Sequence, residues 1–154
     1  MGVSELAGAP PVRLGHVADD SIAVSVYVLV REGARRRPEL AAAMAASIRM
    51  RFDDGYAPVR VDFRGDEIEV ADDAAGEDRA CDLELSGRLG DITALIAAPL
   101  AGGLPKPTTR RGRGALARLA DGRVEFDGSL GLARNLLRLL AVDAEPAARA
   151  VLSR

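Results

Sequence analysis

The sequence predicts an α+β domain in which a five-stranded, mostly antiparallel sheet has one face covered by helices. Five short segments alternate apolar and charged residues, which is the pattern of strands with one buried face. Several other segments carry leucine and isoleucine at helical spacing. An apolar sheet face of this size would drive association if it were exposed, so we expect the helices to cover it.

The predicted strands are short, and compact turns separate the first three. The strands span residues 48–53, 59–64, 67–70, 81–85 and 123–126. Asp53-Asp54-Gly55 supplies turn residues after the first strand, and Gly65-Asp66 predicts a two-residue hairpin connection after the second. Because charged residues alternate with the apolar ones, the face of the sheet without helices is expected to be charged.

The predicted helices have apolar residues on one side and residues suited to capping before them. The segments with helical spacing are 89–96, 116–119 and 132–140. Pro38 opens a further short, alanine-rich helix, since proline is tolerated in a first turn. Thr108 or Thr109 can cap the second of the three segments, and Asp127 or Ser129 can cap the third.

One apolar segment, residues 22–30, has two interpretations. Its valines and isoleucine favour a strand by propensity. Asp19-Asp20-Ser21 before it and Gly33 after it are instead typical of the start and stop of a helix. Apolar residues occupy every side, so periodicity does not decide between the two, and the residues alone leave this segment open.

Composition excludes several classes of protein. A chain with one cysteine and one histidine forms neither an internal disulfide nor a His/Cys zinc site. No apolar stretch approaches the ~20 residues of a membrane span, and the first residues lack the pattern of a secretion signal. We expect a metal-free, cytoplasmic domain at residues 17–142, with a mobile arm at 1–16 and a C-terminal tail at 143–154.

The motifs of catalysis and cofactor binding are weak in this sequence. Residues 17–142 contain no histidine, which removes the usual general base, and no Gly-x-Ser-x-Gly elbow occurs. Gly112-x-Gly114-x-x-Ala117 matches the short form of a dinucleotide-binding fingerprint, but a basic loop precedes it instead of a strand. We therefore expect no enzyme, no catalytic residue and no cofactor.

A basic stretch follows the acidic half of the chain. Residues 1–100 carry 11 basic and 18 acidic side chains, a net charge of −7, whereas residues 101–154 carry 10 and 5, a net charge of +5. Between residues 106 and 123 the only acidic residue is Asp121. No aromatic residue interleaves these cations, so a single-strand nucleic-acid platform is not predicted. The stretch is either a solvated loop or a site for an anionic group, formed by Arg110, Arg111 and Arg113.

Three blocks of the sequence resemble one known family. They are VREGARRRPELAAAMAASIRMRFDDG, CDLELSGRLGDITALI and GRVEFDGSLGLARNLLRLL. They resemble the sterol carrier protein type two domain, a nonspecific lipid-binding fold. The predicted order of elements also resembles that family: a helix, a short helix, a strand meander, further helices, a strand and a terminal helix. The resemblance covers about residues 17–142 and departs from the family pattern at 99–114. It implies a helix at 22–30 and a tunnel between the sheet and the helices.

Two functions follow from this resemblance. The first is a noncatalytic carrier that holds a fatty acyl chain, a sterol or a similar apolar molecule, in transient contact with a membrane surface. The residues expected to line its tunnel are Phe52, Phe63, Ile92, Leu95, Ile96, Leu100, Leu104, Phe126, Leu136 and Leu140. On this reading Arg110, Arg111 and Arg113 hold an anionic headgroup at the mouth. The alternative is a ligand-free accessory module with a solid core, serving a partner enzyme or a homodimer; neither predicts DNA or RNA as a partner.

Overall fold

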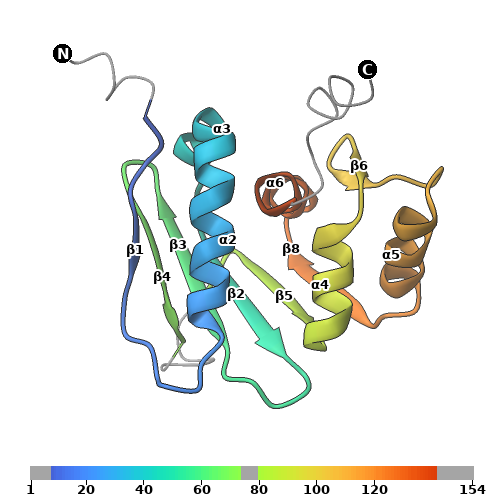
Figure 1. Ribbon diagram of the computed structural model, residues 1–154, viewed down its shortest axis with the longest axis horizontal. Helices are drawn as coiled ribbons and strands as arrows, with labels where there is room; N and C mark the ends of the chain where they lie inside the picture. Colours follow the sequence, from blue (N-terminus) through green and yellow to red (C-terminus); the bar gives the residue numbers. More distant parts are fainter. Residues whose placement is uncertain (1–7, 74–79, 142–154) are drawn as a thin grey trace, which may run out of the picture.

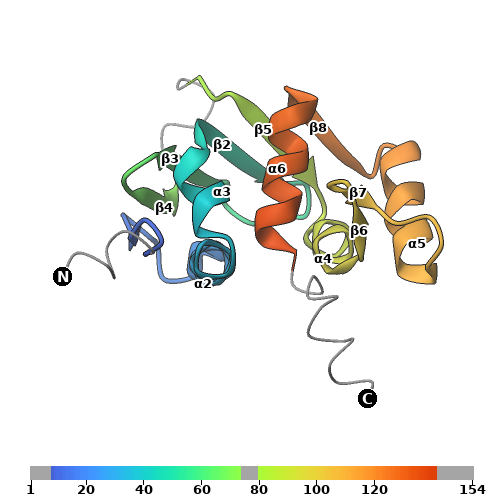
Figure 2. The same cartoon turned by 90° about the horizontal axis from the view of Figure 1, so that it is seen from above.

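A computed structural model describes residues 8–73 and 80–141 of the chain, which form a sheet with helices on one face (Figures 1 and 2). The strands are β1 (Val12–Leu14), β2 (Ala45–Phe52), β3 (Val59–Arg64), β4 (Ile68–Asp72), β5 (Leu83–Gly87) and β8 (Val124–Gly128), and a separate hairpin pairs β6 (Leu100–Ala101) with β7 (Leu104–Pro105). The helices are α2 (Ala23–Arg36), α3 (Pro38–Ala43), α4 (Leu89–Ala97), α5 (Arg110–Ala120) and α6 (Leu130–Leu140). The α+β class and the one-sided helical layer are thereby confirmed.

The sheet has six strands in the order β1-β4-β3-β2-β5-β8, so the predicted number of five is corrected. Neighbours are antiparallel except for the pairs β1–β4 and β2–β5, which are parallel. The additional strand, β1, lies inside the segment predicted as a mobile arm. Local pattern did not predict it, because it has only three residues and pairs along the edge that β4 offers.

An ion pair fastens β1 to the start of β4. The Arg13 guanidinium lies 3.1 Å from the Glu67 carboxylate, to which it donates a hydrogen bond. This hydrogen bond, together with the weaker contribution of Arg64, holds the pKa of Glu67 below its ordinary value. The predicted C-terminal tail and residues 1–7 of the predicted arm lie outside the described residues.

The ambiguous segment is a helix, α2, as the family resemblance implies. Its start is fixed by side-chain hydrogen bonds: the Ser21 hydroxyl accepts from the Ala23 N–H at 2.9 Å and donates to the Asp72 carboxylate. Asp72 also accepts the Ala18 N–H at 2.8 Å, so the beginning of α2 is anchored to the end of β4. The start signal at Ser21, completed by the distant Asp72, thus prevails over the strand propensity of the valines.

Two further predicted helix starts are confirmed in detail. The Thr109 hydroxyl accepts the Gly112 N–H at 2.9 Å and caps α5. The Ser129 hydroxyl accepts the Leu132 N–H at 3.2 Å and caps α6. These hydrogen bonds satisfy backbone donors that a helix N-terminus otherwise leaves unpaired.

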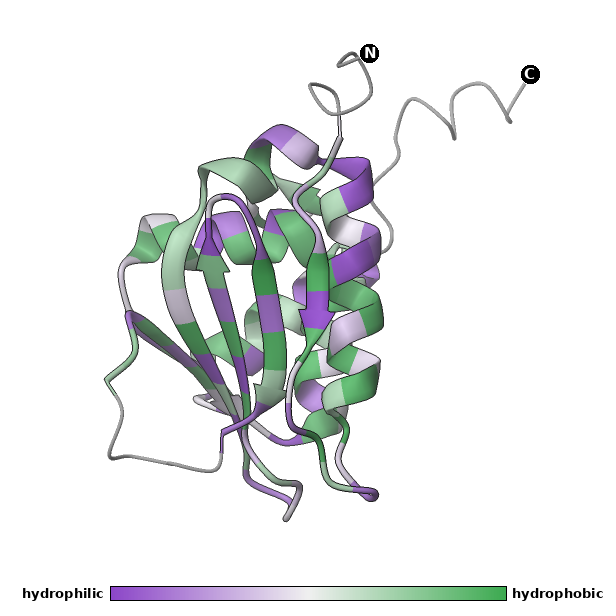
Figure 3. Cartoon of the chain, turned by 90° about the vertical axis from the view of Figure 1, so that its left-hand side faces the viewer, coloured by the Kyte–Doolittle hydropathy of each residue, from purple (hydrophilic) through white to green (hydrophobic). Residues whose placement is uncertain are grey.

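The outer face of the sheet carries charged residues, and some of them are buried in an ionic cluster. Figure 3 shows hydrophilic and hydrophobic residues alternating along the strands. The Asp73 side chain is 0% exposed, and its carboxylate lies 3.6 Å from both Arg49 and Arg60. Arg60, 5% exposed, also pairs with Asp62 at 3.3 Å. The Asp73 carboxylate and the two guanidinium groups compensate each other's charge, since a buried charge without a partner is strongly destabilising.

Helices α2 and α6 approach each other closely at one glycine. A Cβ atom added at Gly33 would lie 2.1 Å from the carbonyl oxygen of Leu139 and 3.2 Å from the side-chain Cγ of Leu139. Both Gly33 and Leu139 are buried. Only a residue without a side chain permits this crossing, so Gly33 sets how near the C-terminal half of α2 lies to α6.

Replacing Gly33 by alanine should therefore destabilise the protein. Alanine gains about 1 kcal/mol in helix propensity, but overpacking against a backbone atom costs at least the upper end of the ~1–3 kcal/mol range. We expect Gly33→Ala to lower the free energy of unfolding by about 2 kcal/mol, measured by urea denaturation. The matched control is Gly90→Ala in α4, where an added Cβ meets no atom within 4 Å and a small gain in stability is expected. A Gly33→Ala variant as stable as its parent would contradict the close approach.

Candidate functional site

An apolar cavity lies between α2 and α4, above β2 (Figures 1 and 2 show the three elements). Eight of its ten lining residues are apolar, and the other two are Ser25 and Thr93. The lining residues are Ile22, Ser25, Val26, Leu29, Met50, Phe52, Leu89, Ile92, Thr93 and Ile96. Since Val26, Met50, Phe52 and Ile92 are buried in the core, the cavity penetrates the layer between helices and sheet.

The size of this cavity limits what can enter it. Its volume is ≈120 Å³, compared with about 150 Å³ for an engineered apolar cavity that binds benzene. Pockets that enclose a whole small molecule measure about 300–1,000 Å³. The cavity therefore has room for a small apolar group, such as the end of an alkyl chain, and not for an entire sterol.

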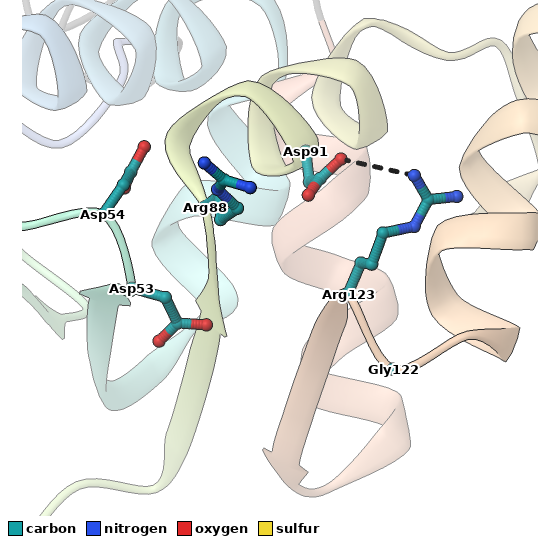
Figure 4. A pocket seen from close by; sticks show the side chains of 6 residues that line it. All are labelled: Asp53, Asp54, Arg88, Asp91, Gly122 and Arg123. Carbon is teal, nitrogen blue, oxygen red and sulfur yellow. Dashed lines mark ion pairs between the residues drawn. The ribbon is translucent and has the colours of Figure 1, made fainter.

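A separate polar hollow of ≈330 Å³ lies where β2 stops and α4 begins (Figure 4). Asp53, Asp54, Arg88, Asp91, Gly122 and Arg123 line it. Both carboxylate oxygens of Asp54 lie 3.2 Å from the Leu89 N–H and accept it at the α4 N-terminus. Asp91 lies 4.0 Å from Arg123, the ion pair drawn in Figure 4, and 2.8 Å from Arg118.

Comparisons with known proteins address the fold of the chain. No family model and no curated protein matches its sequence. Among solved structures, the UbiJ-SCP2 ubiquinone synthesis protein is similar to it at 14% identity and a TM-score of 0.55; the match covers 79% of this chain and 90% of that protein. The sterol carrier protein domain 2 of Helicoverpa armigera is also similar at 14% identity, with a TM-score of 0.53. That match covers 91% of this chain and 96% of the other domain.

The chain has the sterol carrier protein 2 fold. The resemblance inferred from the sequence blocks is thus confirmed at the level of structure. At this identity the likeness concerns the fold alone, so the site has to be judged from the residues of this chain.

The sterol carrier protein 2 fold brings three of the ten predicted tunnel residues to the cavity: Phe52, Ile92 and Ile96. Four others are buried in the core but do not line this cavity; these are Phe63, Leu95, Leu136 and Leu140. Leu100 and Phe126 are half-buried, and Leu104 is 37% exposed on β7. A binding role for all ten residues stays a prediction.

The sequence prediction did not include the α2 side of the cavity. Ile22, Ser25, Val26 and Leu29 follow helical spacing on that side of α2. This signal was present in the sequence but ambiguous, because valines on the other sides of the segment matched a strand equally well. Once the segment is taken as a helix, the same four residues stand out as one face.

The predicted headgroup arginines lie on α5, and α4 stands between α5 and α2 (Figures 1 and 2). All three are exposed and none lines the apolar cavity. Arg111 reaches the Ala97 carbonyl at 3.5 Å, and Arg113 donates to the Pro107 carbonyl at 3.3 Å. They stand in the first turns of α5, where the helix dipole disfavours positive charge.

The part of the chain that the structure describes holds neither a cluster of metal-binding side chains nor a helix that could cross a membrane. Within residues 8–73 and 80–141, no three side chains of the metal-binding types gather in one place. Among those same residues, every helix is too short or too polar to cross a membrane.

Proposed function

We propose that this chain is a noncatalytic binding domain that holds the apolar end of an elongated, lipid-like molecule between α2 and α4. The observation that carries the proposal is the cavity itself, a space of ≈120 Å³ lined mainly by apolar side chains. Well-packed interiors leave few voids larger than a water molecule. A void of this size with this lining suits a hydrocarbon guest better than water, which needs polar partners.

The expected binding energy comes from burying the apolar end. Each buried methylene contributes about 0.8 kcal/mol, so an end of about five methylenes gives about 4 kcal/mol before ordering costs. That is weak on its own. Val24 and Val28 are exposed on α2 beside the rim residues Ser25 and Leu29, and they offer apolar surface to the part of the molecule outside the cavity.

A variant that plugs the rim tests this function. Ser25 is exposed on a helix, so Ser25→Leu should place a large apolar side chain in the opening without disturbing the core. We expect it to reduce binding of an octyl-chain probe about tenfold or more by native mass spectrometry, with an unchanged melting temperature. Ala117→Leu, on an exposed position of α5 that does not line the cavity, is the matched control. Equal probe uptake by Ser25→Leu and its parent, or a ligand-free dimer with no uptake by either, would count against the carrier.

The α5 arginines support a second contact of the same carrier, with an anionic bilayer surface. Three cations near a membrane contribute about 1 kcal/mol each, so Arg110→Gln/Arg111→Gln/Arg113→Gln should weaken binding to phosphatidylglycerol vesicles about 100-fold at low salt. The control triple variant, Arg31→Gln/Arg35→Gln/Arg51→Gln, removes three exposed cations and so has the same net charge, but keeps α5 intact. If both triple variants bind the vesicles equally, α5 is not the contact.

A further inference from the structure

Three arginines surround a hollow of ≈390 Å³ where α2, α3 and α6 come together (Figure 2 shows the three helices). Arg36 ends α2, Arg37 joins α2 to α3, and Arg138 belongs to the last turn of α6. Glu39 and Leu40 of α3 complete the lining. This arginine hollow shares no lining residue with the apolar cavity or with the hollow of Figure 4, so it is a separate feature of the surface.

The lining of the arginine hollow carries an excess of positive charge. Three guanidinium groups and one carboxylate, that of Glu39, leave a net charge of +2. Within residues 8–73 and 80–141, none of the three arginines makes an ion pair. Glu32, the other acidic residue of α2, is engaged with Arg35 at 3.2 Å. Because like charges repel one another, an anion with two negative charges would stabilise this lining.

Two of the arginines are held in place by carbonyl groups of α6. The Nη2 of Arg36 donates to the Ala141 carbonyl at 3.0 Å, and the Nε of Arg37 donates to the Arg138 carbonyl at 3.1 Å. These bonds satisfy carbonyls that the C-terminus of a helix leaves unpaired. Within the described part of the chain they use one donor of each guanidinium, whereas arginine has five. Both groups are therefore positioned in advance and keep donors for a ligand.

Arg138 differs from the other two because its side chain caps no helix. It is exposed, and among residues 8–73 and 80–141 it donates to no acceptor. Its aliphatic stem is supported by the turn between β6 and β7: a Cβ atom added at Gly103 would lie 3.2 Å from the Cδ of Arg138. The turn thus limits where the guanidinium can lie and leaves all of its donors available.

The chemistry that suits this lining is that of a phosphate monoester. Such a group carries close to two negative charges near pH 7 and has three strongly accepting oxygens, and guanidinium groups bind phosphate through paired hydrogen bonds. A carboxylate, with one charge and two oxygens, leaves part of the lining uncompensated. We propose that the arginine hollow binds a phosphate monoester group. The inference goes beyond the carrier function and does not rest on it, because the hollow and the apolar cavity are separate.

Titration of the full chain with small anions tests the proposal. sn-Glycerol 3-phosphate, inorganic phosphate and acetate are added separately at pH 7 and low salt, and their dissociation constants are measured by NMR shifts. We expect both phosphates to bind at least about tenfold more tightly than acetate, the scale of one additional hydrogen bond between charged groups. The Nε–H signals of Arg36 and Arg37 should shift with the phosphates.

Two variants should change this affinity in opposite directions. Arg138→Gln removes a guanidinium that makes no hydrogen bond within the described residues, so it should weaken glycerol 3-phosphate about tenfold with an unchanged melting temperature. Glu39→Gln removes the one carboxylate of the lining and should strengthen binding severalfold. Arg51→Gln, an exposed change on the outer sheet face with the same effect on net charge as Arg138→Gln, is the matched control and should leave the affinity unchanged.

Vesicles that contain phosphatidic acid, whose head is also a phosphate monoester, identify the source of the group. Equal weakening of glycerol 3-phosphate and of these vesicles by Arg138→Gln supports the site with a lipid head as its ligand. Weakening of glycerol 3-phosphate alone supports the site with a soluble ligand. Phosphates that bind no more tightly than acetate would overturn the proposal, as would phosphate affinities that ignore both Arg138→Gln and Glu39→Gln.

Discussion

The position of α2 depends on one close approach between helices, and the cavity depends on the position of α2. At Gly33 the helix lies against the backbone of Leu139 in α6, with no room for a side chain. A rigid helix held at its C-terminal half, and anchored at its start through Ser21 and Asp72, has little freedom left. Its N-terminal half therefore keeps a fixed distance from α4, and the side chains available there do not fill the space between them. The candidate binding site is thus a consequence of how two contacts, Gly33 with Leu139 and Ser21 with Asp72, hold α2 in place.

The two faces of the sheet serve this arrangement differently. The inner face supplies the floor of the cavity through Met50 and Phe52. None of the helices within the described residues covers the outer face. There, the buried pairs of Asp73 with Arg49 and Arg60 tie the start of the β4–β5 connection to β2 and β3. Replacing one member would leave its partner charged and buried, so the cluster specifies this arrangement even though an ion pair of this kind adds little net stability.

Local pattern was enough for most of the fold. Alternation along β2 to β5 and β8 predicted which residues face the helices, and Thr109 and Ser129 marked helix starts correctly. The first strand was missed because three residues carry no pattern, and β1 exists only through its pairing with β4.

The residues of the candidate site were harder to predict from the sequence than the fold. Phe52, Ile92 and Ile96 follow from the inward face of strand and helix, but the α2 wall needed the helix assignment that local chemistry left open. Nothing in the sequence alone places Arg88 beside Asp53, since that neighbourhood is made by the parallel pairing of β2 with β5.

The account depends most on an apolar guest entering between α2 and α4. A crystal structure with an octyl compound that carries bromine at the end of its chain tests this directly, because the anomalous signal of bromine locates the chain end. The account predicts a peak enclosed by Val26 of α2 and Ile92 of α4, above Met50. A crystal in which side chains of the protein fill that space, with the bromine elsewhere, would contradict it.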